Sequence, residues 1–138
     1  MKIVLDTNVL VSGLLTPFGS SGEIIRMVFS NELTLFLDAR ILSEYRDVLH
    51  LPKFSFNKDD VATLLEFIKY YGRVIAGTPL INPLPDQEDE PFLEVAIAGN
   101  VKALVTGNAA HYPVSLREGV RLLSPAEFIG FYRKMEKI

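Results

Sequence analysis

The chain opens on an unbroken apolar run that ends in an acidic residue. Ile3, Val4 and Leu5 are followed directly by Asp6, in a stretch too short to form a helix of its own. Such a run is typical of a strand that is buried on both faces, as in a parallel sheet. Open α/β sheets bind ligands at the carboxyl ends of their strands, which is where Asp6 falls. Asp6 is therefore either a functional carboxylate or a residue that begins a turn.

Short apolar runs alternate with longer amphipathic stretches along the rest of the chain. Further strands are predicted over 33–37, 73–76, 103–106 and 120–123. Helices are predicted between them, and their expected first or capping residues are Ser20, Asp38, Asn57, Glu90 and Ser124. Strands that alternate with helices indicate an α/β fold, with a parallel sheet covered by helices on both faces. No linker or repeat interrupts the sequence, so residues 1–138 are expected to form one domain.

Two pairs of residues at predicted helix starts have the spacing of a capping box. In this arrangement a serine and a glutamate three residues later each bond the other's backbone N–H. The pairs are Ser20 with Glu23, and Ser124 with Glu127. We therefore expect both helices to begin at the serine.

The composition excludes several classes of protein. The sequence contains no cysteine, which excludes disulfides, thiolate metal sites and a cysteine nucleophile. No stretch reaches the roughly 18 apolar residues of a membrane span, and nothing at the N-terminus resembles a signal peptide, so a cytoplasmic protein without a membrane partner is expected. The 14 Lys and Arg against 17 Asp and Glu give a net charge of −3, which is not the bulk signature of a nucleic-acid binder. A divalent cation in an acidic site can supply local positive charge instead.

Two further acidic features lie on predicted helices or next to them. Glu44 flanks the apolar stripe of its helix, so partial burial is expected; the alternative is an exposed pair with Arg40, worth ~0.3 kcal/mol. The segment 86–90 carries four carboxylates in five residues before a helix, where acids also serve as ordinary caps. With Asp6 these side chains supply oxygen ligands, which suit Mg²⁺ or Mn²⁺ rather than Zn²⁺. The matching chemistry is metal-assisted hydrolysis of a phosphodiester.

Four segments, in this order, resemble those of PIN-domain proteins, in particular toxin components of toxin–antitoxin systems. The segments are 4–10, 42–49, 86–96 and 104–108, so the resemblance extends over most of the chain. The resemblance implies a three-layer α/β/α sandwich around a parallel sheet. It also implies an endoribonuclease that depends on Mg²⁺ or Mn²⁺, often as a homodimer held inactive by an antitoxin.

The resemblance also implies roles for individual acidic residues. Asp6, Glu44 and Asp89 match the acidic triad of the family, so they are the predicted catalytic and metal-binding residues. Asp86 falls at a position that is often acidic in this subfamily and is a further predicted metal ligand.

Three polar residues are predicted to support these acids. By the same resemblance, Asn8 matches a residue that steadies the first aspartate, and Thr106 matches a hydroxyl near the site. Asn108 stands where the family usually has aspartate, in a Thr-Gly-Asp turn. Its carbonyl can still ligate a cation but brings no charge. We therefore expect weaker binding of a second metal, with Asp86 compensating, and low or absent activity is an open outcome.

Basic and aromatic side chains near the Glu44 helix are candidates for contact with RNA. Arg40, Arg46 and Lys53 are placed to hold the phosphate backbone, although each also fits an ordinary solvated residue. Phe54 and Phe56 are candidates for stacking on bases, with a core or dimer-interface role as the alternative. His111 follows the Asn108 turn and fits either a phosphate contact or a surface loop.

Two other functions remain open beside the nuclease. In the first, Asn108 marks a degenerate site, and the domain is a scaffold that binds RNA or a protein partner. In the second, Asp6 is the nucleophile of an aspartyl phosphatase or phosphotransferase. Enzymes of that haloacid-dehalogenase type need an acid two residues after the nucleophile, and Asn8 stands there instead. The sequence therefore favours the nuclease over the phosphatase.

Overall fold

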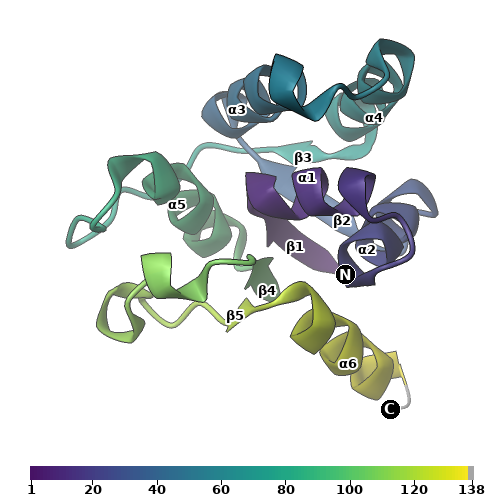
Figure 1. The fold of residues 1–138 in the computed structure, drawn as a ribbon. Coiled ribbons are helices and arrows are strands. Elements are labelled where there is room, and N and C mark those ends of the chain that lie inside the picture. Colours follow the sequence, from purple (N-terminus) through teal and green to yellow (C-terminus); the bar gives the residue numbers. More distant parts are fainter. Residues whose placement is uncertain (137–138) are drawn as a thin grey trace.

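A five-stranded parallel sheet runs through the middle of the molecule (Figure 1). The computed structural model describes residues 1–136. The strands lie in the spatial order β3-β2-β1-β4-β5, and all their pairings are parallel. Their bounds are β1 Lys2–Leu5, β2 Thr34–Leu37, β3 Arg73–Val74, β4 Ala103–Val105 and β5 Leu122–Leu123. Ile3, Val4 and Leu5 are fully buried in the central strand, which confirms the prediction for the opening run.

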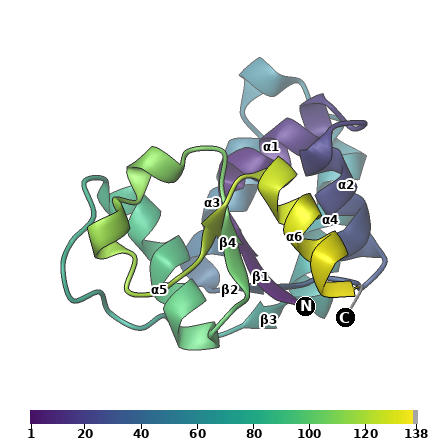
Figure 2. The ribbon, with the colours of Figure 1, turned by 90° about the horizontal axis from the view of Figure 1, so that it is seen from below.

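Helices cover both faces of the sheet, as the sequence predicted. They are α1 Thr7–Leu15, α2 Ser20–Phe29, α3 Ala39–Leu49, α4 Lys58–Tyr71, α5 Glu90–Gly99 and α6 Pro125–Glu136. Helix α5 packs across β2, β1 and β4 on one face, and α1, α2 and α6 lie on the other side (Figure 2). Helices α3 and α4 pack against each other beside β2. The result is the expected three-layer α/β/α sandwich. No helix within residues 1–136 is long and apolar enough to cross a membrane.

Most of the predicted helix starts are confirmed. The Asp38 carboxylate accepts a hydrogen bond from the backbone N–H of Ile41, and the Asn57 side chain caps α4 in the same way. Ser124 and Glu127 form the predicted reciprocal capping box at the start of α6. Each of these caps satisfies backbone N–H groups that have no partner inside the helix.

The capping box predicted for Ser20 and Glu23 is wrong. Gly19 is the N-cap of α2 and Ser20 is already helical, because the N–H of Glu23 donates to the carbonyl of Gly19 at 3.0 Å. The Glu23 carboxylate instead pairs with Arg133 of α6 at 3.2 Å. The Glu23 side chain therefore forms a tertiary ion pair with α6 in place of the helix cap that the local pattern predicted.

Helix α1, which the sequence analysis did not assign, begins directly after Asp6. Its apolar residues lie on several sides, so the sequence shows no clear helical period there. Gly13 lies where α1 meets α2, and a Cβ at this position would approach the carbonyl oxygen of Ser21 to 2.9 Å. The absent side chain allows the two helices to pack closely.

The strand order places Asp6 at the point where the direction of winding reverses. From β1 the chain adds β2 and β3 on one side, and then β4 and β5 on the other. The carboxyl ends of β1 and β4 therefore flank the crevice where α/β sheets bind ligands. Asp6 follows β1 and Thr106 follows β4, and the N–H of Asp6 donates to the carbonyl of Val105 at 2.9 Å.

Candidate active site

Asp6 is buried at the end of β1 and is held by two hydroxyl groups. Thr106 Oγ1 and the Tyr112 hydroxyl donate to Asp6 Oδ2 over 2.9 and 3.1 Å. Burial raises the pKa of Asp6, and the two hydrogen bonds oppose that rise because they favour the ionised form. Both donors reach the same oxygen and so fix the orientation of the carboxylate, and a backbone hydrogen bond from Thr7 also favours its ionised form.

Tyr112 is a residue of the site that the sequence did not predict. This side chain is fully buried, and burial followed by the negative charge of Asp6 raises its pKa far above the ordinary value. The hydroxyl therefore stays protonated and donates to Asp6. Tyr112 lies in an irregular loop after β4, where no periodic pattern marks a buried residue. Its nearness to the predicted turn at 106–108 was the only signal available.

Glu44 is half-buried on α3 and faces α1. The hydroxyl of Thr7, in the first turn of α1, donates to Glu44 Oε2. Burial raises the pKa of Glu44, and the nearby charge of Asp6 raises it further. The alternative pair with Arg40 is wrong, because the Arg40 guanidinium lies 2.7 Å from the carboxylates of both Asp38 and Glu94.

Asp89 carries a buried oxygen that has no hydrogen-bond partner among the described residues. This atom is Oδ2, and His111 Nδ1 lies 3.3 Å from it without forming a hydrogen bond. Burial, followed by the charge of Asp6, raises the pKa of Asp89 to about 6, and His111 opposes the rise. An ionised carboxylate that is buried without a partner is costly, which makes Asp89 the clearest functional candidate among the acids.

Asp86 is the N-cap of a short 3-10 helix, η2 (Gln87–Asp89), which leads directly into α5. Asp86 is exposed, and its Oδ1 accepts from the N–H of Glu88 at 2.9 Å. Its charge nevertheless contributes to the raised pKa of both Asp89 and Glu44. Asp86 therefore combines an ordinary capping role with a place in the acidic cluster.

The turn after β4 is held by Asn8 and Thr106. Asn8 Oδ1 accepts from the N–H of Gly107 at 2.9 Å, and the N–H of Asn108 donates to Thr106 Oγ1 at 3.0 Å. Asn8 therefore supports Asp6 only indirectly, through the turn that positions the Thr106 hydroxyl. The side chain of Asn108 is exposed at this turn.

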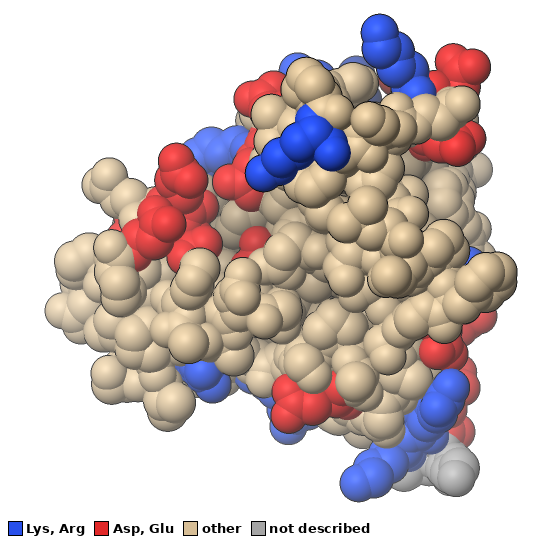
Figure 3. Space-filling view, viewed as in Figure 1, with Lys and Arg blue, Asp and Glu red and all other residues tan. Residues whose placement is uncertain are grey.

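Acidic side chains gather in a hollow between α3 and the start of α5 (Figure 3). Asp6, Glu44 and Asp89 belong to this cluster, because the charge of Asp6 raises the pKa of the other two. Within residues 1–136, no group of three or more acidic or histidine side chains is arranged so that it could hold a metal ion as it stands. Mg²⁺ normally takes one or two carboxylates and keeps several waters, so an open set of hard oxygen donors fits it. The unpartnered Asp89 oxygen is a ready ligand.

Comparison with known proteins identifies the family. A family model described as "PIN domain" matches residues 2–110. The chain belongs to the PIN domain family. Proteins of this family typically are nucleases that use divalent metal ions.

Two individual proteins resemble this PIN domain over most of their length. The uncharacterized protein MJ1680 of Methanocaldococcus jannaschii is 26% identical over 147 aligned positions, which cover 97% of this chain and 93% of that protein. A chain in the crystal structure of VapBC2 from Rickettsia felis, bound to a DNA fragment from their promoter, matches with a TM-score of 0.58 and 18% identity. The match covers 90% of this chain and 98% of that chain. At this identity the structural likeness shows a shared fold.

The basic residues predicted to contact RNA lie in different surroundings in this PIN domain. Arg40 is bound by two carboxylates, as described above, so its charge is already balanced. Arg46 is exposed on α3 and lines a hollow between α3 and α4. Lys53 is exposed in the turn η1 (Pro52–Phe54), with its ammonium 5.1 Å from the centre of the Phe54 ring. Contact of these three residues with RNA remains a prediction.

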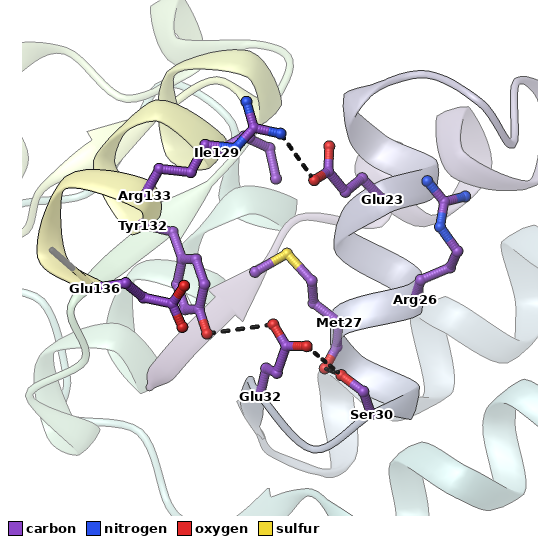
Figure 4. A pocket seen from close by; sticks show the side chains of 9 residues that line it. All are labelled: Glu23, Arg26, Met27, Ser30, Glu32, Ile129, Tyr132, Arg133 and Glu136. Carbon is purple, nitrogen blue, oxygen red and sulfur yellow. Dashed lines mark hydrogen bonds and ion pairs between the residues drawn. The ribbon is translucent and has the colours of Figure 1, made fainter.

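A pocket of about 390 Å³ lies between α2 and α6 (Figure 4), and its lining includes none of Asp6, Glu44 and Asp89. Its charged groups already have partners. Arg133 pairs with Glu23, the Tyr132 hydroxyl donates to Glu32 at 3.3 Å, and Arg26 donates to the carbonyl of Pro17. The Arg133–Glu23 pair joins α6 to α2, and the Tyr132–Glu32 bond joins α6 to the segment between α2 and β2, so the pocket belongs to the packing of the fold.

Proposed function

We propose that this PIN domain is an endoribonuclease that binds Mg²⁺ or Mn²⁺ through Asp6, Glu44 and Asp89, with Asp86 as a further ligand. The observation that carries the proposal is the buried oxygen of Asp89, which lacks a hydrogen-bond partner beside two other carboxylates with raised pKa values. A bound cation relieves this repulsion. When bound, the ion activates a water and stabilises the charge that develops on phosphorus.

The chain's own residues orient the carboxylates for this reaction. Thr106 and Tyr112 hold one oxygen of Asp6, and Thr7 holds one oxygen of Glu44. Fixed geometry contributes to catalysis because the acids need not reorganise when substrate arrives.

RNA cleavage by purified protein tests the proposal. Cleavage is expected to require Mg²⁺ or Mn²⁺ and to stop in EDTA. The Asp6→Asn variant is expected to lose cleavage while it keeps the fold, as measured by circular dichroism. The matched control is Glu66→Gln, which removes one exposed negative charge from α4. Cleavage by Asp6→Asn at the wild-type rate, or cleavage that EDTA leaves unchanged, contradicts the proposal.

A second candidate function follows from Asn108, which supplies no charge at the turn after β4. On this view the domain binds RNA or protein without cleaving it. Calorimetry with Mn²⁺ separates the two, since a scaffold is expected to take up no metal at millimolar concentration. The Asn108→Asp variant sharpens the test. The backbone of the turn is held by Asn8 and Thr106, so the substitution adds charge while the fold persists. If the nuclease proposal is right, this variant binds Mn²⁺ more tightly than the wild type.

The likeness in fold to a chain of the VapBC2 structure supports a role as the toxin of a toxin–antitoxin pair, acting on RNA in the cytoplasm. An antitoxin partner and a homodimer belong to this proposal. Co-expression with the product of an adjacent small reading frame, followed by affinity purification, tests the partner. Size-exclusion chromatography with light scattering tests the dimer. The exposed charges of Arg46 and Lys53 are proposed to hold RNA phosphates, which predicts that binding weakens as salt rises.

A further inference from the structure

A mainly apolar groove begins at the candidate active site and runs between α1, α3 and η1. Its volume is about 400 Å³, which is within the usual range of ligand pockets. Thr7 and Glu44 line it as well as the acidic site, so the groove and the acidic cluster are continuous. Figure 3 shows that the surface over α1 is largely free of charged side chains. The remaining wall is formed mainly by Val11, Leu15, Val48 and Phe54.

An aromatic ring with a nearby cation stands on this wall. Phe54 stacks on Phe56, with ring centres 5.3 Å apart and planes 13° from parallel. Phe56 lines a neighbouring hollow rather than the groove, so it supports the Phe54 ring from outside the groove. The Lys53 ammonium lies 5.1 Å from the centre of the same ring. Aromatic rings flanked by basic groups are the usual platform for unpaired bases, whose phosphates bind the cation.

We propose that this groove binds an unpaired base of the RNA strand, next to the phosphate that the carboxylates act on. The base stacks on Phe54, and Lys53 contacts the backbone beside it. This inference rests on the proposed nuclease function and assigns the groove to a base beside the cleaved phosphate. A base within a duplex is already stacked and paired, so it cannot enter the groove without first leaving the helix.

The shared lining favours a nucleobase over an apolar protein segment as the occupant. The groove is continuous with the carboxylates through Thr7 and Glu44, and the Lys53 cation is placed on its aromatic wall. A strand with its phosphate at the carboxylates therefore places a neighbouring base at the groove entrance. The positive charge of Lys53 complements a phosphate, whereas an apolar side chain carries no charge that could pair with it.

Binding of a short fluorescent single-stranded RNA, followed by anisotropy in Ca²⁺, tests the proposal. Loss of stacking on one base is expected to raise the Kd of Phe54→Ala by roughly 5-fold to 150-fold. Phe54→Trp keeps an aromatic surface and is expected to retain binding, even if Phe54→Ala proves less stable. Tyr70→Ala is the matched control, because it removes an exposed aromatic ring from α4 that lies outside the groove. Its Kd is expected to match the wild type.

A second RNA, with one abasic nucleotide beside the cleaved phosphate, identifies the base that stacks. On this RNA the wild type and Phe54→Ala are expected to bind equally, and duplex RNA is expected to bind both weakly. If Phe54→Ala binds single-stranded RNA as the wild type does, the groove serves another occupant, such as a protein segment, and the inference is wrong. It is also wrong if the wild type binds no RNA.

Cleavage in Mn²⁺ distinguishes failure of the proposed function from failure of this inference. Binding that depends on Phe54 without any cleavage refutes the nuclease and keeps the base site. Cleavage that neither Phe54→Ala nor the abasic nucleotide changes keeps the nuclease and refutes the base site.

Discussion

Replacing Asp89 with asparagine is expected to stabilise the metal-free protein and to weaken its uptake of metal. Asp89 has a buried oxygen without a hydrogen-bond partner, and its pKa is raised to about 6 by burial and by the charge of Asp6. Asparagine has nearly the same shape and no charge. The substitution therefore removes a repulsion that folding has to overcome whenever the carboxylate is ionised.

The size of the effect follows from the pKa. A rise from the ordinary value of 3.8 to about 6, at about 1.36 kcal/mol for each unit, corresponds to about 3 kcal/mol when Asp89 is ionised. The folded state holds the proton more tightly than the unfolded state does. The contribution of Asp89 is thus favourable at low pH, and this advantage is lost as the pH rises from about 4 to about 6. Loss of the contact with His111 offsets part of this stabilisation. We therefore expect Asp89→Asn to raise the free energy of unfolding by about 1–3 kcal/mol near pH 7.5.

Urea unfolding in EDTA measures this gain. The difference between Asp89→Asn and the wild type is expected to be largest near pH 7.5 and about half as large near pH 5, because the wild-type carboxyl is then mostly protonated. The control Glu66→Gln, on the exposed side of α4, is expected to change the free energy of unfolding by less than about 0.5 kcal/mol at either pH. An Asp89→Asn variant no more stable than the wild type near pH 7.5, or a difference that does not shrink near pH 5, refutes the reasoning.

Three further predictions concern Tyr112 and two glycines. Tyr112→Phe removes a buried donor to Asp6 and is expected to cost about 1–2 kcal/mol of stability, measured by urea unfolding, and to weaken Mn²⁺ binding measured by calorimetry. Gly22→Ala is expected to destabilise by several kcal/mol, since a Cβ there would lie 2.0 Å from the carbonyl oxygen of Pro17. Gly130→Ala, on α6, meets nothing within 4 Å and is expected to stabilise by about 0.5–1 kcal/mol. Thermal unfolding of the two glycine variants checks both signs.

The sequence predicted the sheet and most helices because their signals are local. The apolar runs at β1, β2 and β4 are short and unbroken, and caps such as Asp38 and Asn57 lie within three residues of the groups they satisfy. Helix α1 was missed for a physical reason: it is apolar on several sides, so no period distinguishes it from a buried strand or loop. The capping prediction at Ser20 failed because the partner of Glu23, Arg133, lies far away in the sequence.

The candidate site was less predictable, because its geometry depends on contacts between distant segments. Asp6, Glu44 and the acidic segment 86–90 were singled out from their places in the sequence pattern, and resemblance to a family then selected Asp89 within that segment. The roles of these residues remain predictions. Of the hydroxyl groups that hold these acids, Thr106 was predicted from the resemblance, whereas two others were not: Thr7 lies 37 positions from Glu44, and Tyr112 lies 106 positions from Asp6. Spacing along the chain carries no information about such pairs.

Asp6 and Asp38 show why strand order decides which acid is available for chemistry. Both follow buried parallel strands and lie at the same edge of the sheet. The Asp38 carboxylate accepts hydrogen bonds from the backbone N–H of Ile41, at the N-terminus of α3, and from the Arg40 side chain. Asp6 lies beside β4, where the winding reverses, and its partners come from the loop after that strand. These partners hold one oxygen of the carboxylate. Which strand-end aspartate is available for chemistry in this fold therefore depends less on its own strand than on the strand beside it.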